Sequence, residues 1–196
     1  MNCSFSDFIY IADNALEPDF CQSVIEKFEN DRTKCQGVIG VKEKIDLNIK
    51  DSTDLFITNK ENWKEEDRVF YESLKKHNSI YSTDSPWIKI HSPHRGDVSD
   101  SGYQIQRTFP GSGYTWHVDS MGDQWVENMG VRWMTYIWYL NDIDEGGYTE
   151  FIDGTKVQPR QGRICLFPAT WTYIHRGYPP TNQTKYLATG WMYQKA

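Results

Sequence analysis

The sequence predicts a mainly β fold with helices in its N-terminal half, of the α+β class. From Tyr103 onward, short aromatic and β-branched segments alternate with Gly, Pro, Asn and Asp, which is typical of short strands joined by turns. Such a pattern favours a sandwich or a jelly-roll barrel. At 196 residues the chain has the size of a single domain, 1–196. Within it we expect a helical support segment, 1–102, and a β core, 103–193.

Two segments of the first half have apolar residues at helical spacing. The first covers residues 17–30, EPDFCQSVIEKFEN, in which Pro18 suits the first turn of a helix. The second covers residues 61–81, ENWKEEDRVFYESLKKHNSIY. The expected apolar stripes are Phe20, Val24, Ile25 and Phe28 in the first helix, and Trp63, Val69, Phe70 and Leu74 in the second. Residues 35–57, between the helices, are predicted to be loop with short extended segments.

The second half contains the expected strands and two loops of interest. The strands are expected at 103–109, 114–118, 132–140, 148–152, 163–167, 171–175 and 185–193. Residues 92–102 and 120–130 are rich in turn-forming residues and connect these elements. Because substrate recognition often lies on long loops of a rigid scaffold, both are candidate substrate-recognition loops.

The composition argues against several classes of protein. The net charge is −6, and a broad nucleic-acid surface needs dense positive charge, so we expect no nucleic-acid partner. The four cysteines form no C-x-x-C pair, which disfavours a zinc knuckle, and their spread along the chain suggests free thiols in a reducing compartment, with a disulfide as the alternative. We see neither a signal-peptide pattern at the start nor an apolar stretch of membrane-spanning length. We therefore expect a soluble, cytoplasmic protein with no membrane partner.

The segment TWHVDS holds two side chains that could bind a metal. His117 and Asp119 are two residues apart, and side chains two apart on a strand point to the same face. Alone, such a pair can equally be a simple hydrogen-bonded couple. His175 lies in a later strand-like segment, WTYIH, and offers a third ligand. Two histidines and one carboxylate on a facial arc are the arrangement of non-heme Fe(II) oxygenases, which leaves other positions of the metal open.

A lysine follows these ligands in the last strand-like segment, KYLATGWMY. Lys185, Leu187, Thr189 and Trp191 share one face by alternation. A lysine on an apolar face needs an anionic partner, because an isolated buried ammonium is costly. A carboxylate of a bound co-substrate would provide that partner. The alternative is that Lys185 extends to solvent from the end of the strand.

Together with EGGYTEF, this ordered set resembles the 2-oxoglutarate- and Fe(II)-dependent dioxygenases, most of all the prolyl 4-hydroxylase-like branch. The similarity covers about Tyr103 to Tyr193, and NALEPDFCQSVIEKFE resembles the leading segment of that branch more weakly. The resemblance implies a double-stranded β-helix, the jelly-roll architecture of cupins. It also implies O2 as co-substrate, with ascorbate as a candidate reductant. The implied roles are Fe(II) binding by His117, Asp119 and His175, pairing of Lys185 with the distal carboxylate of 2-oxoglutarate, support of that carboxylate by Tyr139, and lining of the same pocket by Thr189 and Trp191.

The sequence departs from the pattern of many relatives at two positions. Phe109 stands eight residues before the first ligand, where many relatives have a tyrosine. Its hydrogen bond is either missing or supplied by Tyr103 or Tyr114. Lys185 replaces an arginine, as it does in part of the prolyl hydroxylase branch. Relatives that demethylate nucleic acids carry a spaced arginine pair after the last ligand, whereas here Arg176 alone follows His175.

The activity implied by the resemblance is hydroxylation of a C–H bond, coupled to conversion of 2-oxoglutarate to succinate and carbon dioxide. Prolyl residues in a peptide or protein are the expected substrate. Two alternatives stay open, namely the same chemistry on a free amino acid or other small molecule, and a non-catalytic jelly-roll module that binds metal. Succinate formation by the purified protein separates the enzyme from the module.

Overall fold

The computed structural model describes residues 3–6, 8–40, 44–84, 98–120 and 130–194. The helical elements are α1 (Pro18–Asn30), the 3-10 turn η1 (Glu61–Trp63) and α2 (Lys64–Asp84). The strands of the N-terminal half are β1 (Cys3–Ser6), β2 (Ile9–Ala12), β3 (Cys35–Gln36), β4 (Thr53–Phe56) and β5 (Val98–Asp100). The later strands are β6 (Gln104–Thr108), β7 (Tyr114–His117), β8 (Val131–Tyr139), β9 (Thr149–Phe151), β10 (Lys156–Val157), β11 (Arg163–Pro168), β12 (His175–Gly177) and β13 (Lys185–Gln194).

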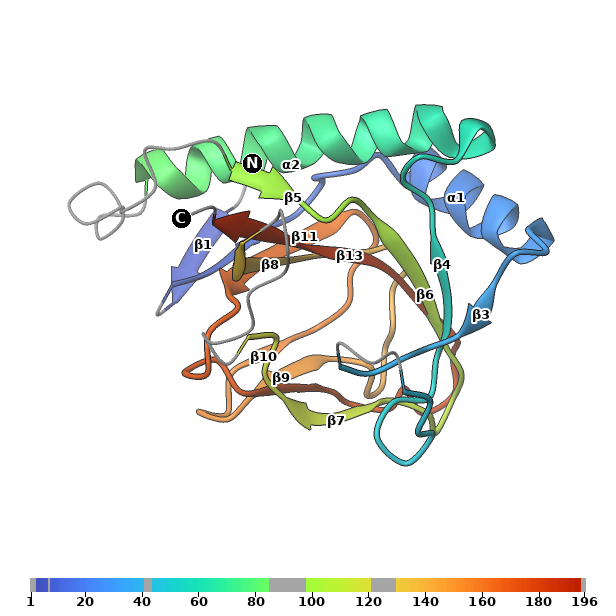
Figure 1. Cartoon of the computed structure of the whole chain (residues 1–196). Helices are drawn as coiled ribbons and strands as arrows, with labels where there is room; N and C mark the ends of the chain where they lie inside the picture. The colour runs from blue at the N-terminus through green and yellow to red at the C-terminus, as the bar shows by residue number, and fades with distance from the viewer. Residues whose placement is uncertain (1–2, 7, 41–43, 85–97, 121–129, 195–196) are drawn as a thin grey trace.

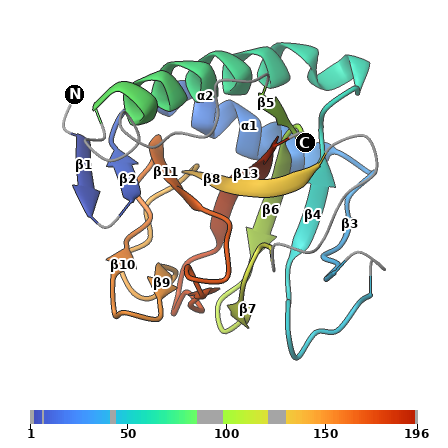
Figure 2. The ribbon, with the colours of Figure 1, turned by 60° about the vertical axis from the view of Figure 1, so that its left-hand side comes forward.

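Across the described residues the strands form two antiparallel sheets. The large sheet has the order β1-β2-β11-β8-β13-β6-β4-β3, with β5 paired to β13, and the small sheet has the order β10-β9-β12-β7. Helices α1 and α2 lie along one face of the large sheet, and the small sheet lies on the opposite side (Figures 1 and 2). The predicted architecture, a mainly β jelly roll with N-terminal helices, is confirmed.

Side chains of β8 alternate between the helix-covered face of the large sheet and the face toward the small sheet. Tyr136 and Trp138 are fully buried in the core beneath the helices. Thr135, Ile137 and Tyr139 point the other way, toward the small sheet, as period-two alternation requires. The helix side of the sheet is thus an aromatic core, and the opposite side is left for a cavity.

Both expected helices form, and their apolar stripes face the large sheet. Val24 and Phe28 of α1 are fully buried. Phe70 of α2 stacks on Tyr103 and packs against Trp138, with ring centroids 5.4 and 5.2 Å apart. Burial of large rings of this kind stabilises the helices, because most helical stability in proteins comes from packing of an apolar face.

Residues 35–57 contain short extended segments, as predicted, and one of them, β4 (Thr53–Phe56), pairs with β6 in the large sheet. One part of the sequence prediction differs from the structure. The strand expected at 171–175 is wrong for most of its length. The Tyr173 N–H donates to the Thr170 carbonyl at 3.0 Å and closes a turn, so β12 begins only at His175.

Strands from before and after the predicted boundary at residue 102 pair with one another in the large sheet. β2 and β4 come from the expected support segment and pair with β11 and β6 of the expected core. The division of the chain at this point stays a prediction. Most of the two candidate recognition loops, residues 92–97 and 121–129, lies outside the described residues. None of the helices in the described parts of the chain has both the length and the apolar character needed to cross a membrane.

Candidate metal centre and its cavity

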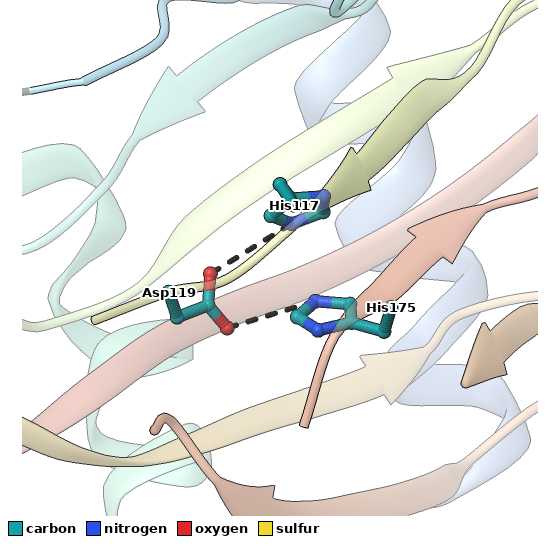
Figure 3. A group of neighbouring side chains, drawn as sticks. All are labelled: His117, Asp119 and His175. Carbon is teal, nitrogen blue, oxygen red and sulfur yellow. Dashed lines mark ion pairs between the residues drawn. The ribbon is translucent and has the colours of Figure 1, made fainter. Parts of the chain in front are cut away.

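Two histidines from different strands of the small sheet lie side by side. His117 is the last residue of β7, and His175 is the first residue of β12. The two are cross-strand partners, so their side chains point to the same face, with ring centroids 4.2 Å apart (Figure 3). Pairing of strands far apart in the sequence therefore brings the two predicted imidazoles together.

Asp119 completes the group from a bend beyond the end of β7. Its Oδ1 lies 3.8 Å from His117 Nε2, and its Oδ2 lies 3.7 Å from His175 Nε2 (Figure 3). The hydroxyl of Thr135 on β8 donates to Asp119 Oδ2 at 2.6 Å and fixes the carboxylate. One ligand atom from each residue lies within 4.8 Å of the other two, which is close enough for a shared metal ion.

The hydrogen bonds and pKa values of these residues favour the protonation states that bind a cation. The Nδ1 atoms of His117 and His175 contact the Thr115 and Tyr173 carbonyls at 2.8 and 2.9 Å, so Nδ1 carries the proton and Nε2 keeps its lone pair. Burial, with His175 nearby, lowers the pKa of His117 to about 4. Burial raises the pKa of Asp119, but the imidazoles and Thr135 outweigh it and hold that pKa below its usual value. At neutral pH His117 is therefore neutral and Asp119 is ionised, as metal binding requires.

Three aromatic residues considered in the sequence have distinct positions around the group. Tyr114 stacks on His117, with ring centroids 3.6 Å apart and an angle of 12° between the rings, and it lines the cavity. Tyr103 is buried under the helices, on the other face of the large sheet. Phe109 is half exposed and lies beneath the Arg107 guanidinium, 4.5 Å away. Of the two tyrosines that could replace the usual one, Tyr114 is the one at the cavity.

Lys185 lies at the wall of the same cavity as the three candidate ligands. Its side chain is buried, at 3% exposure for the residue, which excludes the solvent-extended alternative. The ammonium donates to the Gly147 carbonyl at 3.0 Å, and in the described parts of the chain no carboxylate lies within ion-pair distance of it. Burial lowers the pKa of Lys185 to about 8. A buried ammonium that lacks an acidic partner is a ready site for an anion.

Of the remaining predicted pocket residues, two line the cavity and one lies behind its wall. Thr189 and Trp191 of β13 line it. Tyr139 is fully buried, and its hydroxyl shares a 2.6 Å hydrogen bond with the hydroxyl of Thr149, which does line the cavity. Its expected contact with a bound carboxylate stays a prediction.

Sequence reasoning missed one wall of the cavity, which comes mainly from the residues that lead into β4. Lys50 and Ser52 line it, and Asp54 accepts from the Lys50 ammonium at 2.6 Å and from the Ser52 hydroxyl at 2.8 Å. Gln106 of β6 lines the cavity beside them. Alternation in YQIQRTF could have placed Gln104 and Gln106 on one face, but only strand pairing with β4 brings Lys50 and Asp54 next to them.

Comparison with known proteins agrees with this site. Residues 103–193 match the 2OG-Fe(II) oxygenase superfamily. The match covers the whole of the predicted β core. The predicted resemblance to that superfamily, with prolyl 4-hydroxylase-like neighbours, is confirmed. A probable prolyl 4-hydroxylase 3 of Arabidopsis thaliana is 30% identical over 120 residues, 47% of this chain and 42% of the plant protein. The aligned stretch thus spans less than half the length of that relative.

Solved structures of prolyl hydroxylases share the fold of the oxygenase core and its helices. A viral collagen prolyl hydroxylase from Paramecium bursaria Chlorella virus-1, in complex with 2OG, superimposes with a TM-score of 0.67 at 17% identity, over 97% of this chain and 98% of that one. A prolyl hydroxylase from Trichoplax adhaerens, in complex with a hypoxia-inducible factor peptide fragment, gives a TM-score of 0.76 at 16% identity, over 96% and 84%. At these identities the comparison establishes the fold.

The residues of the site fit the two cofactors of the superfamily, Fe(II) and 2-oxoglutarate. Imidazole and carboxylate are ligands that Fe(II) accepts, and a 2-His-1-carboxylate set is its usual arrangement in oxygenases. Both imidazoles and the carboxylate are held by hydrogen bonds to the carbonyls of Thr115 and Tyr173 and to the hydroxyl of Thr135. The unpaired ammonium of Lys185 suits one carboxylate of a dicarboxylic acid in the same cavity.

Proposed function

We propose that this protein is a Fe(II)- and 2-oxoglutarate-dependent dioxygenase that hydroxylates prolyl residues in a peptide or protein. His117, Asp119 and His175 hold the iron through Nε2, one carboxylate oxygen and Nε2. Together, bound Fe(II) and 2-oxoglutarate supply the dioxygen chemistry that places a hydroxyl group on a C–H bond. The protein contributes position, charge and exclusion of water.

The observation that carries this proposal is the pairing of two features in one cavity. A facial set of three ligands stands at one part of the wall, and the buried, unpaired ammonium of Lys185 stands at another. In the proposal, Lys185 binds the distal carboxylate of 2-oxoglutarate. Tyr139 supports the cavity wall through its hydrogen bond to Thr149, and Thr189 and Trp191 line the same cavity.

The choice of a peptide substrate is supported by the relatives and by the space at the site. The plant relative is a probable prolyl 4-hydroxylase, and the Trichoplax structure holds a peptide fragment. A second, wider cavity of about 400 Å³ adjoins the metal site and shares Asp119 and Trp191 with it. A proline-rich peptide keeps a preformed polyproline II shape, so it loses little conformational entropy when it binds such a groove.

We expect proline-rich peptides to raise succinate formation above the substrate-free rate and to gain one oxygen atom on proline. The measurement is mass spectrometry on a peptide panel, run beside free proline, other free amino acids and single-stranded DNA. Hydroxylation of a free amino acid with no peptide modified would favour a small-molecule enzyme. Absence of succinate from 2-oxoglutarate under all conditions, with metal bound, would favour a non-catalytic metal-binding module.

Binding of 2-oxoglutarate should weaken in alkaline solution. The pKa of Lys185 in the free protein is lowered to about 8 by burial, so above this pH the side chain loses the proton that attracts the carboxylate. The KM for 2-oxoglutarate should therefore rise with pH above about 8, by up to about tenfold per pH unit. In Lys185→Arg the rise should be absent, because a guanidinium stays protonated throughout this range. A wild-type KM that stays flat to pH 10 would contradict the role of Lys185.

A further inference from the structure

We propose that Gln104 and Gln106 form a substrate-binding amide pair that recognises a backbone amide of the peptide beside the residue to be hydroxylated. The inference rests on the proposed function and deepens it. It names the feature of this site that separates a peptide from a free amino acid.

The pair occupies the face of β6 that points toward the metal centre. Gln104 and Gln106 are two residues apart on the strand, so both side chains point to the same face. Gln104 lies opposite Thr189 on β13, and Gln106 lies opposite Leu187. β13 and β6 run side by side through the large sheet (Figure 1). The amide pair is therefore a direct neighbour of the β13 residues that line the cavity.

The pair lies beside two cavities that share lining residues, an inner one at the candidate metal ligands and a wider one. The inner cavity, of about 80 Å³, is lined by Gln106 together with Lys185 and the candidate metal ligands. The wider cavity, of about 400 Å³, is lined by both glutamines and by the half-exposed Phe56. Asp119 borders both. A peptide that presents one residue to the metal would pass this point with its backbone.

The chemistry of the pair suits one donor and one acceptor on the ligand. Gln106 Nε2 donates to Gln104 Oε1 at 2.9 Å, which joins the two amides. Their outer groups, an NH2 on Gln104 and a carbonyl on Gln106, have no protein partner within the described residues. If both amides are turned over, the outer groups exchange, and one donor and one acceptor still remain. A backbone amide offers the complementary carbonyl and N–H.

Among the described residues, two cations line the wider cavity, Lys50 and Arg132, and Arg132 donates to the Tyr193 hydroxyl and the Asp119 carbonyl. The ammonium of Lys50 is compensated by Asp54 at 2.6 Å, and Asp54 also accepts from Ser52. This buried pair is neutral overall, unlike Lys185, which has no carboxylate partner in the described parts of the chain. A free amino acid would bring a carboxylate and an ammonium to this point, and taking these two charges out of water costs more than burying a neutral amide. A peptide amide satisfies the outer groups of the glutamine pair without a net charge.

The test combines protein variants with modified peptides. Gln104→Met, Gln106→Met and the double variant keep the side-chain length and remove the amides. We expect each single variant to raise the peptide KM about tenfold, with little change in kcat, because an interaction made equally in ground and transition state is lost. We expect the double variant to cost less than the sum of the two, since the amides act as a unit. The KM for 2-oxoglutarate is measured in parallel.

A peptide series identifies the contacted group. In each peptide one backbone N–H near the proline is methylated, and one position should raise the wild-type KM about tenfold while having no further effect in Gln106→Met. Gln22→Leu, on the exposed side of α1, is the control and should match wild type. The inference would be overturned if methylation of the peptide raised the KM equally in wild type and in the variants. It would also be overturned if the variants raised the KM for 2-oxoglutarate instead of the KM for the peptide. If wild type turns over no peptide, the proposed function itself fails, and this inference fails with it.

Discussion

Replacing His117, Asp119 or His175 by alanine is expected to abolish turnover while the protein stays folded. Among the described residues, these three form the group that could hold a metal ion, and two ligands cannot hold iron with positions free for co-substrate and oxygen. We expect a loss of more than about a hundredfold, because even partners that merely orient a ligand are worth 10–100-fold. Iron content after reconstitution, anaerobic metal titration and circular dichroism would separate loss of metal from loss of fold.

Thr135→Val provides a graded control for this prediction. Its hydroxyl donates to Asp119 Oδ2 at 2.6 Å, and valine keeps the shape without the hydrogen bond. An intermediate loss of metal affinity, of about 10–100-fold, is expected. If one of the three alanine variants kept near wild-type turnover with no added ligand, that residue would not be a metal ligand.

The metal centre could be predicted from the sequence because its signals are local. Alternation places His117 and Asp119 on one side, and a strand-like segment supplies His175. The strand in fact ends at His117, and Asp119 reaches the same position from a bend held by Thr135. The structure brings the three predicted residues together, and alternation along the strand misses the means by which the carboxylate is held. Alternation likewise placed Lys185 on the inward face of the last strand.

The other side of the cavity could not be predicted, because it depends on pairing between distant strands. Nothing in the sequence around Lys50 and Asp54 indicates that β4 pairs with β6. Residues 35–57 lack a clear period, since short strands beside turns carry little periodicity. The turn at Thr170–Tyr173 was missed for a related reason. Aromatic and β-branched residues favour strands, and here a local hydrogen bond overrides that preference.

Replacing Lys185 by methionine should produce opposite effects on 2-oxoglutarate binding and on the stability of the free protein. In the proposal, Lys185 pairs with the distal carboxylate, and removing one partner of a buried pair typically costs about 3–5 kcal/mol. At about 1.4 kcal/mol per tenfold, the lower figure is a rise in the 2-oxoglutarate KM of more than about a hundredfold. Iron binding should change little. Lys185→Arg should recover part of the loss, because its planar fork must fit a site shaped for an ammonium.

The stability of the free protein gives a readout that does not depend on turnover. Burial lowers the pKa of Lys185 to about 8, below its value in the unfolded chain, so the protonated form opposes folding at pH 7. Lys185→Met removes this penalty at the cost of the hydrogen bond to the Gly147 carbonyl. We expect the variant to be more stable than wild type by about 1–3 kcal/mol at pH 7 in denaturant unfolding.

Denaturant unfolding at several pH values tests whether the buried charge causes the difference in stability between wild type and Lys185→Met. As pH rises through 8 toward the ordinary pKa of lysine, folded wild type loses its buried charge, so the gap between wild type and Lys185→Met should narrow. Adding 2-oxoglutarate should stabilise wild type and leave the variant unchanged. A variant less stable than wild type at pH 7, with an unaltered response to 2-oxoglutarate, would show that Lys185 supports the fold instead of binding the co-substrate.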